Sequence, residues 1–200
     1  LTVLSLAPAI LVVVTSFTRI VIVLSLLRSA LGVQTTPPNV VIISLALFLT
    51  AFIMAPTFEQ AWEDGIQPLL NEEIEEREAF DRAIVPVRAF MLTHVREKDL
   101  ALFLDIGNID TSGLTPEQTP LQALIPAFMI SELRRAFEIG FLLFVPFLVI
   151  DMVVASVLMS MGMMMLPPII ISLPFKLIFF VIVDGWNLVA ASLVRSFTGG

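Results

Sequence analysis

The chain has 200 residues, of which 58% are hydrophobic and only 14% charged, and its formal net charge is −7. Soluble globular domains average about 45–50% apolar and about 25% charged residues, so this composition indicates a membrane protein. The chain has no cysteine, which excludes disulfides and thiolate metal sites, and its acidic balance argues against a nucleic-acid partner.

Four apolar runs are each long enough to cross about 30 Å of hydrocarbon, which takes about 20 helical residues. They cover residues 1–27, 40–58, 139–161 and 169–194. A short turn, residues 29–39, joins the first two runs, and residues 161–168 join the last two. Because short connections join antiparallel neighbours, we expect two helical hairpins.

The segment between the hairpins, residues 59–138, holds 16 of the 18 acidic residues and seven of the 11 basic ones, a net charge of −9. Apolar residues recur at helical spacing over residues 72–84 and 87–106, and Gly107 is expected to end the second of these helices. Further helix starts are expected at Thr115-Pro116-Glu117-Gln118 and at Ser131-Glu132. No alternating strand pattern of useful length occurs.

These patterns predict an all-α, membrane-associated fold in three parts. The parts are a first hydrophobic helical hairpin (1–58), an acidic helical insert (59–138) and a second hydrophobic hairpin with a Met-rich loop (139–200). The sequence begins at Leu1, which would fit a cleaved secretory signal. Such a signal would place the insert outside the cytoplasm and point both short turns inward.

Prolines mark the expected irregularities of the hydrophobic helices. Pro37-Pro38 precedes the second run, where proline suits the first turn of a helix. Pro146 and Pro174 lie inside the third and fourth runs and are expected to kink them. In the loop between these runs, Gly162 supplies conformational freedom and Pro167-Pro168 restarts the helix.

Four charged residues, Arg19, Asp151, Lys176 and Asp184, lie inside the apolar runs. A lone charge in a bilayer is costly, so partners are expected. Asp151 lies 13 residues before Met164 and Lys176 lies 12 after it, so the two have nearly the same depth in a hairpin. Arg19 joins this layer if both turns face the same side.

The charges in this layer have two interpretations. Arg19, Asp151 and Lys176 could form a proton or ion relay. Alternatively, they form an interhelical or intersubunit ion pair that sets register, or face an aqueous pore, and the local balance of acids and bases favours this structural role. Asp184 is expected to make a polar contact at an interface.

The residue types that common enzymes require are missing. His94 is the single histidine, which excludes a two-histidine zinc protease motif, and no glycine-rich phosphate loop occurs. The acidic run at residues 72–78 could be taken for a cation site, but a solvated helix face is the better interpretation. We therefore expect no enzymatic activity, no metal and no cofactor.

Several long strings resemble one family closely. They are TSFTRIVIVLSLLRSALG (15–32), QTTPPN (34–39), LALFLTAFIMAP (45–56), PFLVIDMVVASVLMSMGMMMLPP (146–168) and ISLPFKLIFFVIVDGW (171–186). They resemble the FliP family, core membrane proteins of the bacterial type III export gate, over both hairpins. The related injectisome proteins often have Ser-Pro in place of Pro167-Pro168, which favours the flagellar branch and leaves an injectisome gate subunit as the alternative.

The resemblance implies a homopentamer that assembles with FliR and FliQ, and also FlhB, in the bacterial inner membrane at the flagellar basal body. It implies export of unfolded flagellar proteins, an insert in the periplasm, and hairpins held largely within the assembly rather than as four simple spans. It also implies that the Met-rich loop forms a gasket around the pore, a role that falls on Met163, Met164 and Met165.

Methionine suits a gasket because its unbranched, polarizable side chain can fill an irregular aperture, and apolar constrictions can close by dewetting. The plainer alternative is that these methionines pack against neighbouring helices or lipid. Two other functions compete with a protein-conducting gate. They are a proton- or ion-coupled carrier that uses Asp151 and Lys176, and a scaffold without a transport role.

Overall fold

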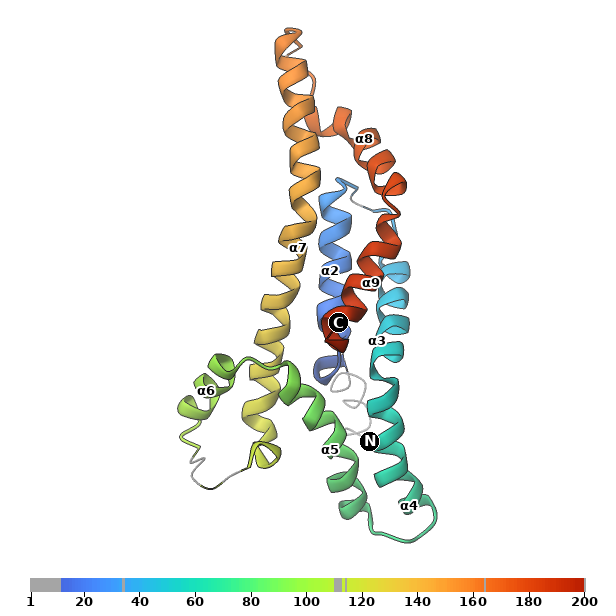
Figure 1. Cartoon of the computed structure of the whole chain (residues 1–200), viewed down its shortest axis with the longest axis vertical. Helices are drawn as coiled ribbons and strands as arrows, with labels where there is room; N and C mark the ends of the chain where they lie inside the picture. Colours follow the sequence, from blue (N-terminus) through green and yellow to red (C-terminus); the bar gives the residue numbers. More distant parts are fainter. Residues whose placement is uncertain (1–11, 34, 110–112, 114, 164, 200) are drawn as a thin grey trace. The chain divides into compact units, whose positions relative to one another are not determined.

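The fold is described from a computed structural model, which describes residues 12–33, 35–109, 113, 115–163 and 165–199. These residues form, in chain order (Figure 1), α2 (Phe17–Ala30), α3 (Asn39–Ala61), the π-helical turn η1 (Trp62–Ile66), α4 (Gln67–Leu70), α5 (Glu76–His94), α6 (Glu97–Ile106), the 3-10 turn η2 (Pro116–Gln118), α7 (Leu121–Ser160), α8 (Pro168–Ile182) and α9 (Gly185–Thr198). No β-strand occurs among the described residues. The predicted all-α fold is confirmed.

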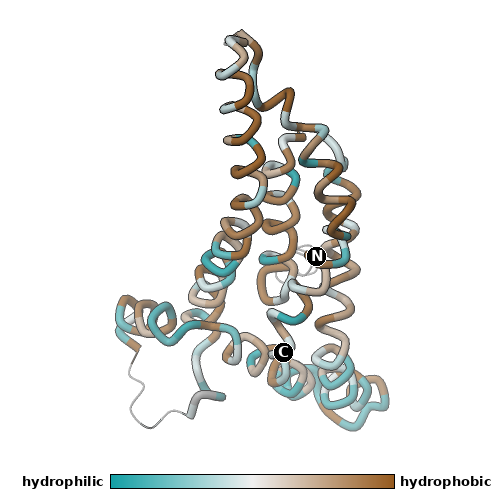
Figure 2. The backbone as a smooth tube through the Cα atoms, turned by 45° about the horizontal axis from the view of Figure 1, so that its top comes forward, coloured by the Kyte–Doolittle hydropathy of each residue, from teal (hydrophilic) through white to brown (hydrophobic). Residues whose placement is uncertain are grey.

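Two stretches of helix within the described residues are long and apolar enough to cross a membrane. One is continuous through α3, η1 and α4 (Asn39–Leu70), and the other is α7. A third exists if α8 and α9, which are bent by 63° relative to each other, act as one broken span. Figure 2 shows hydrophobic residues along α8 and the part of α7 that precedes it. The first predicted apolar run begins in residues 1–11, which lie outside the described residues.

The start of α7 differs from the prediction. The helix begins at Leu121, directly after Pro120, and runs for 40 residues, so the start predicted at Ser131-Glu132 is wrong. Ser131 does not cap α7: it lies within that helix, and its hydroxyl lies 2.9 Å from the carbonyl of Ala127, one turn earlier. The pattern at Thr115 yields only the single turn η2, whose Gln118 side chain accepts the Thr115 N–H at 3.1 Å.

The chain forms two compact units, of which the first comprises residues 1–18 and 50–134. Its apolar core lies between α5 and α7 and contains Val14, Val87, Met91, Leu124 and Phe128. Gly65 of η1 lies against α5 so closely that an added Cβ would be 2.7 Å from the carbonyl oxygen of Ala79 and 2.7 Å from Cβ of Ala83. Gly107 is the C-cap of α6, where the sequence predicted the helix to end.

The second unit comprises residues 19–49 and 135–200. Leu26 of α2 lies against Gly140 of α7, where an added Cβ would meet the Leu26 side chain. Aromatic rings join α7 to α8 and α9, with centroid distances of 6.3 Å for Phe147–Phe180 and 5.3 Å for Phe180–Trp186. The predicted division into two hydrophobic hairpins and an acidic insert concerns which parts lie in the membrane and which in water. It stays a prediction.

The bend of the last apolar run is not at a proline. α7 and α8 continue through Pro146 and Pro174 without interruption. The break lies at Val183 and Asp184, and Asp184 has the left-handed backbone conformation with φ 50° and ψ 51°. This conformation is uncommon outside glycine but is tolerated by the short side chain of aspartate. It directs the chain from α8 into α9.

Candidate functional site

The methionine turn (residues 161–166) ends α7 in a pattern that glycine makes possible. The N–H of Gly162 donates to the carbonyl of Met159 at 3.1 Å, and the N–H of Met163 donates to that of Leu158 at 3.0 Å. This is the Schellman arrangement, in which a residue of positive φ follows the helix, and φ of Gly162 is +72°. An added Cβ there would have no atom within 4 Å, so the backbone conformation, not crowding, favours glycine. Pro167 then precedes α8, which begins at Pro168.

Methionine side chains of this turn are exposed in the described residues. Met165 is 98% exposed and Met163 is 42% exposed, whereas Met164 lies outside the described residues. No charged residue occurs between Asp151 and Lys176 in the sequence. An apolar tip of this kind is costly in water and marks a surface that protein or lipid covers.

Asp151 and Lys176 lie on the two helices that flank the methionine turn, and they come together as their sequence spacing predicted. Nζ of Lys176 lies 2.6 Å from Oδ2 of Asp151, and the ammonium is almost fully buried. The Ser172 hydroxyl donates to Oδ1 of the same carboxylate at 2.5 Å. Together with the carbonyl of Ala30, which Nζ of Lys176 approaches to 3.4 Å, these groups form what we call the polar cluster.

The carbonyl of Ala30 places Lys176 at the C-terminal end of α2. The last carbonyls of a helix lack partners within the helix and carry the negative end of its dipole, so a cation there is stabilised. Gly32 follows α2 with φ +80°, and an added Cβ would lie 3.8 Å from Nζ of Lys176. Lys176 therefore satisfies two acceptors at once, a carboxylate from α7 and a carbonyl from α2.

Arg19 does not belong to this cluster, so the prediction that it shares the layer is wrong. Its Nη1 donates to the carbonyl and hydroxyl of Ser196 at 3.1 and 2.9 Å, and its Cζ lies 3.6 Å from the centroid of the Phe197 ring. Arg19 precedes Ala30 by 11 residues of helix, which is about 16 Å. The buried guanidinium thus donates to a carbonyl in the last turn of α9, as the Lys176 ammonium does at the end of α2.

Asp184 lies at the break between α8 and α9 and is exposed. Its carbonyl accepts the N–H of Leu188 at 3.1 Å, which begins α9. A role for its carboxylate at an interface stays a prediction.

An apolar groove of about 540 Å³ runs between α7 and α8. We call it the interhelical groove; it is lined by Val149, Ile150, Val153, Val154, Val157, Leu158, Ile171, Phe175 and Phe179. The two arms of the hairpin are therefore incompletely packed against each other along the stretch that contains the polar cluster.

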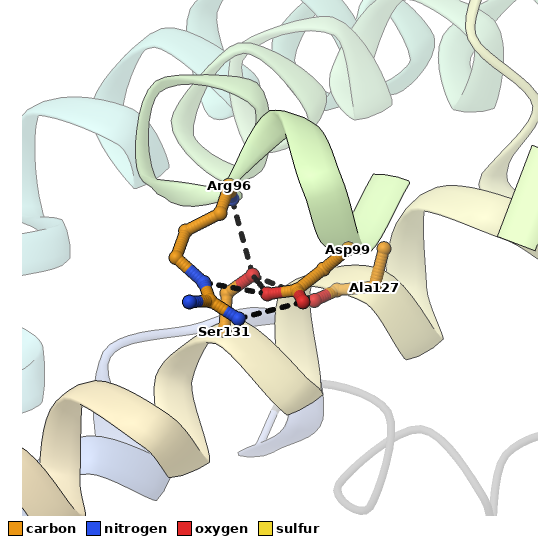
Figure 3. A network of polar contacts seen from close by, with 4 residues as sticks. All are labelled: Arg96, Asp99, Ala127 and Ser131. Atoms are coloured by element: carbon orange, nitrogen blue, oxygen red, sulfur yellow. Dashed lines mark hydrogen bonds and ion pairs between the residues drawn. The ribbon is translucent and has the colours of Figure 1, made fainter. Parts of the chain in front are cut away.

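The first unit contains a second polar network that the sequence did not predict (Figure 3). Asp99 accepts hydrogen bonds from the Arg96 guanidinium at 2.7 and 2.8 Å and from the Ser131 hydroxyl at 2.6 Å. Burial alone would raise the pKa of Asp99, but the hydrogen bonds from Ser131 and Arg96 and the charges of Arg96 and Arg134 outweigh it and lower that pKa.

Local spacing could have indicated some of these partners. Arg96 and Asp99 are three residues apart, and Ser172 and Lys176 are four apart, so each pair shares a helix face. The contacts of Ser131 with α6 and of Arg19 with α9 leave no such local signal. Within the described residues, no group of three or more His, Asp and Glu side chains could hold a metal ion.

Comparison with known proteins supports the resemblance in the sequence. A sequence model of the FliP family matches residues 1–193. Proteins named flagellar biosynthetic protein FliP are similar over nearly the whole chain. The one from Caulobacter vibrioides is 66% identical over 100% of this chain and 75% of its own length. Those from Rhizobium meliloti and Bacillus subtilis are 58% and 56% identical over 98% of this chain, and over 81% and 89% of their own lengths. The chain belongs to the FliP family.

Proposed function

We propose that the chain is a subunit of the flagellar protein export apparatus and forms a protein-conducting gate in the bacterial inner membrane. The relatives' names refer to flagellar biosynthesis, which favours this branch over the injectisome alternative. Helices long and apolar enough to span a bilayer support a membrane location.

The methionine turn is the observation that carries the proposal. It presents exposed apolar side chains of a flexible type, and no charged residue occurs in the sequence between Asp151 and Lys176. In a ring of identical copies, Met163, Met164 and Met165 would meet around one axis, seal it against ions, and deform around an unfolded chain in transit.

The exposed apolar surface of the second hairpin supports assembly with other chains. On α7, Phe141, Leu142 and Met152 are each more than 60% exposed, a larger apolar face than a monomer in water tolerates. We propose a homopentamer assembled with FliR, FliQ and FlhB, with unfolded flagellar proteins as substrates and the acidic insert in the periplasm. The role is that of a conduit rather than an enzyme.

The polar cluster favours a structural role over the carrier alternative. Lys176 is 3% exposed and held between a carboxylate and a helix end, contacts that fix the position of its side chain and support a structural ion pair. Arg19, the third member of the suggested relay, serves a different helix end.

The test replaces Met163, Met164 and Met165 together by Ala in the assembled complex. The gate proposal expects ion leakage across vesicles or cells, with the complex still assembled and substrate export reduced or deregulated. Met152→Ala is the comparison for losing an exposed methionine away from the turn, because Met152 is 62% exposed on α7 and lies about 12 Å before the end of that helix; it tests the apolar face and should not leak ions. An assembled triple variant that holds ions as tightly as the control and exports normally contradicts the gasket.

A further inference from the structure

The polar cluster joins three segments that are far apart in sequence. Asp151 comes from α7, Ser172 and Lys176 from α8, and the Ala30 carbonyl from the end of α2. All belong to the second unit. The cluster therefore ties the hairpin that carries the methionine turn to the first hydrophobic hairpin.

Between this cluster and the turn, the contacts have a different character. The residues from Met152 to Phe175 carry no charge. The interhelical groove runs past the cluster on both sides, from Val149 and Phe179 to Val157 and Ile171, so the cluster supplies the directional contacts in an otherwise loosely packed stretch of α7 and α8. Hydrogen bonds and ion pairs hold one geometry, whereas apolar contact is non-directional and tolerates sliding. The directional contacts between α7 and α8 thus lie at the polar cluster, and the contacts between the cluster and the turn are apolar.

The described start of the turn is held by its own backbone. It is closed by its own backbone hydrogen bonds at Gly162 and Met163, and the space around Gly162 is open. The start of the turn is thus stabilised by the end of its own helix, and the turn connects the two arms α7 and α8. From Asp151 to Met161 the arm of α7 is ten residues, about 15 Å.

We propose that the polar cluster is a pivot. Asp151, Ser172 and Lys176 are positioning residues that hold α7 and α8 against the end of α2, while the arm of about 15 Å from Asp151 to Met161 moves with the methionine turn. Its role in sealing rests on the proposed gate function. The pivot as such is a property of this chain alone. It lets the turn yield to substrates of varied size and return to one closed position.

The absence of cysteine from the sequence gives a clean background for spin labels. One label is placed at Ser29, which is exposed near the end of α2, and a second at either Met161 or Leu148. Leu148 lies three residues before Asp151, whereas Met161 lies at the tip. Distances are measured by electron paramagnetic resonance in the assembled complex, with labelled chain diluted in unlabelled chain.

In the native sequence, we expect a narrow distance distribution for Ser29–Leu148 and a broad one for Ser29–Met161. Asp151→Asn should broaden the Ser29–Leu148 distribution and shift it to longer distances, and Ser172→Ala should do so to a smaller degree. Ser156→Ala is the matched control, because the Ser156 hydroxyl donates to the Met152 carbonyl of its own helix. It should leave both distributions unchanged.

Two results overturn the pivot. One is a tip distribution as narrow as that at the base in the native chain. The other is an unchanged base distribution in Asp151→Asn or, if that variant does not assemble, in Ser172→Ala, which keeps the ion pair. Ion leakage is recorded on the same samples. If the base distribution broadens in Asp151→Asn but the triple Met variant does not leak, the gate is contradicted and the pivot stands. If the triple Met variant leaks but the base distribution is unchanged in Asp151→Asn and Ser172→Ala, only the pivot is contradicted.

Discussion

The hydroxyl of Ser131 lies 2.6 Å from Oδ2 of Asp99, and the two residues come from different helices, α7 and α6. The same hydroxyl accepts the backbone N–H of Arg96 at 3.1 Å, where α6 begins. Ser131 is fully buried and Asp99 nearly so. The Ser131 hydroxyl therefore holds two parts of α6 against α7, the backbone at Arg96 and the carboxylate of Asp99 (Figure 3).

Ser131→Ala should lower the free energy of unfolding by about 1–3 kcal/mol, because it leaves a buried carboxylate and a backbone N–H short of a partner. Hydrogen exchange of the full chain checks this, with faster exchange expected in α6. Thr93→Ala is the control, since the exposed Thr93 hydroxyl bonds only within α5 to the Ala89 carbonyl. Equal exchange in the two variants would contradict the linking role of Ser131.

The lowered pKa of Asp99 predicts a pH dependence with a definite sign. A carboxyl whose folded pKa lies below its unfolded value of about 3.9 stabilises the fold above that pH, and this contribution is lost as the pH falls through the folded pKa. Asp99→Asn lacks this contribution, so its stability should fall less than that of the native chain on acidification below about pH 4. Asp81→Asn, at an exposed position, is the comparison in thermal unfolding at each pH.

Lys176→Met should be far more damaging than Lys176→Arg. Loss of the cation leaves a largely buried carboxylate uncompensated, which costs about 3–5 kcal/mol, whereas Arg retains the charge. A relay would require Lys176 to release its proton, which Arg does not do in proteins. Assembly and export are measured for both, with Lys98→Met, at an exposed position, as the control. Assembly retained by Lys176→Arg with complete loss of export would favour the relay.

Arg19→Met should loosen the last turn of α9. It removes donors to the carbonyl and hydroxyl of Ser196 and the cation above the Phe197 ring, interactions worth about 1.5–3 kcal/mol for charged hydrogen bonds. Hydrogen exchange over residues 193–198 should quicken. Arg195→Met, at an exposed position of the same helix, should have little effect, and the reverse order would refute this account of Arg19.

Gly65→Ala should destabilise the first unit despite the better helix propensity of alanine. The new Cβ would lie 2.7 Å from the Ala79 carbonyl oxygen and 2.9 Å from the Ala83 nitrogen, so the backbone of α5 must move, at about 1–3 kcal/mol. At Gly140 the obstacle is the Leu26 side chain, which can rotate. Thermal unfolding should therefore show a larger loss for Gly65→Ala than for Gly140→Ala.

Hydropathy and helix-stop signals predicted much of this fold. Gly107 ends α6, Pro37-Pro38 precedes α3, and the Met-rich loop separates two helices. Start signals failed where tertiary contacts used the same side chain for another purpose. Ser131 has the sequence of a cap, but its hydroxyl is engaged with Asp99 and with the helix interior. Proline likewise did not locate the bend, which lies at Asp184.

For the candidate site, counting residues from the middle of the turn sufficed to pair Asp151 with Lys176, because both helices leave the same turn. It failed for Arg19, because the relation between two hairpins depends on their packing and not on residue counts. The carbonyl partners of Arg19 and Lys176 at the ends of α9 and α2 could not be read from sequence either, since backbone acceptors carry no residue signature.

The length of α7 has a consequence for where its surface is buried. Forty helical residues extend about 60 Å, twice the roughly 30 Å thickness of bilayer hydrocarbon. Lipid tails can therefore cover at most about half of this rod, unless it lies steeply tilted. The other half needs a different environment, and Glu132, Arg134, Arg135 and Glu138 all lie in the first half of the helix, where charged side chains favour a position outside the hydrocarbon.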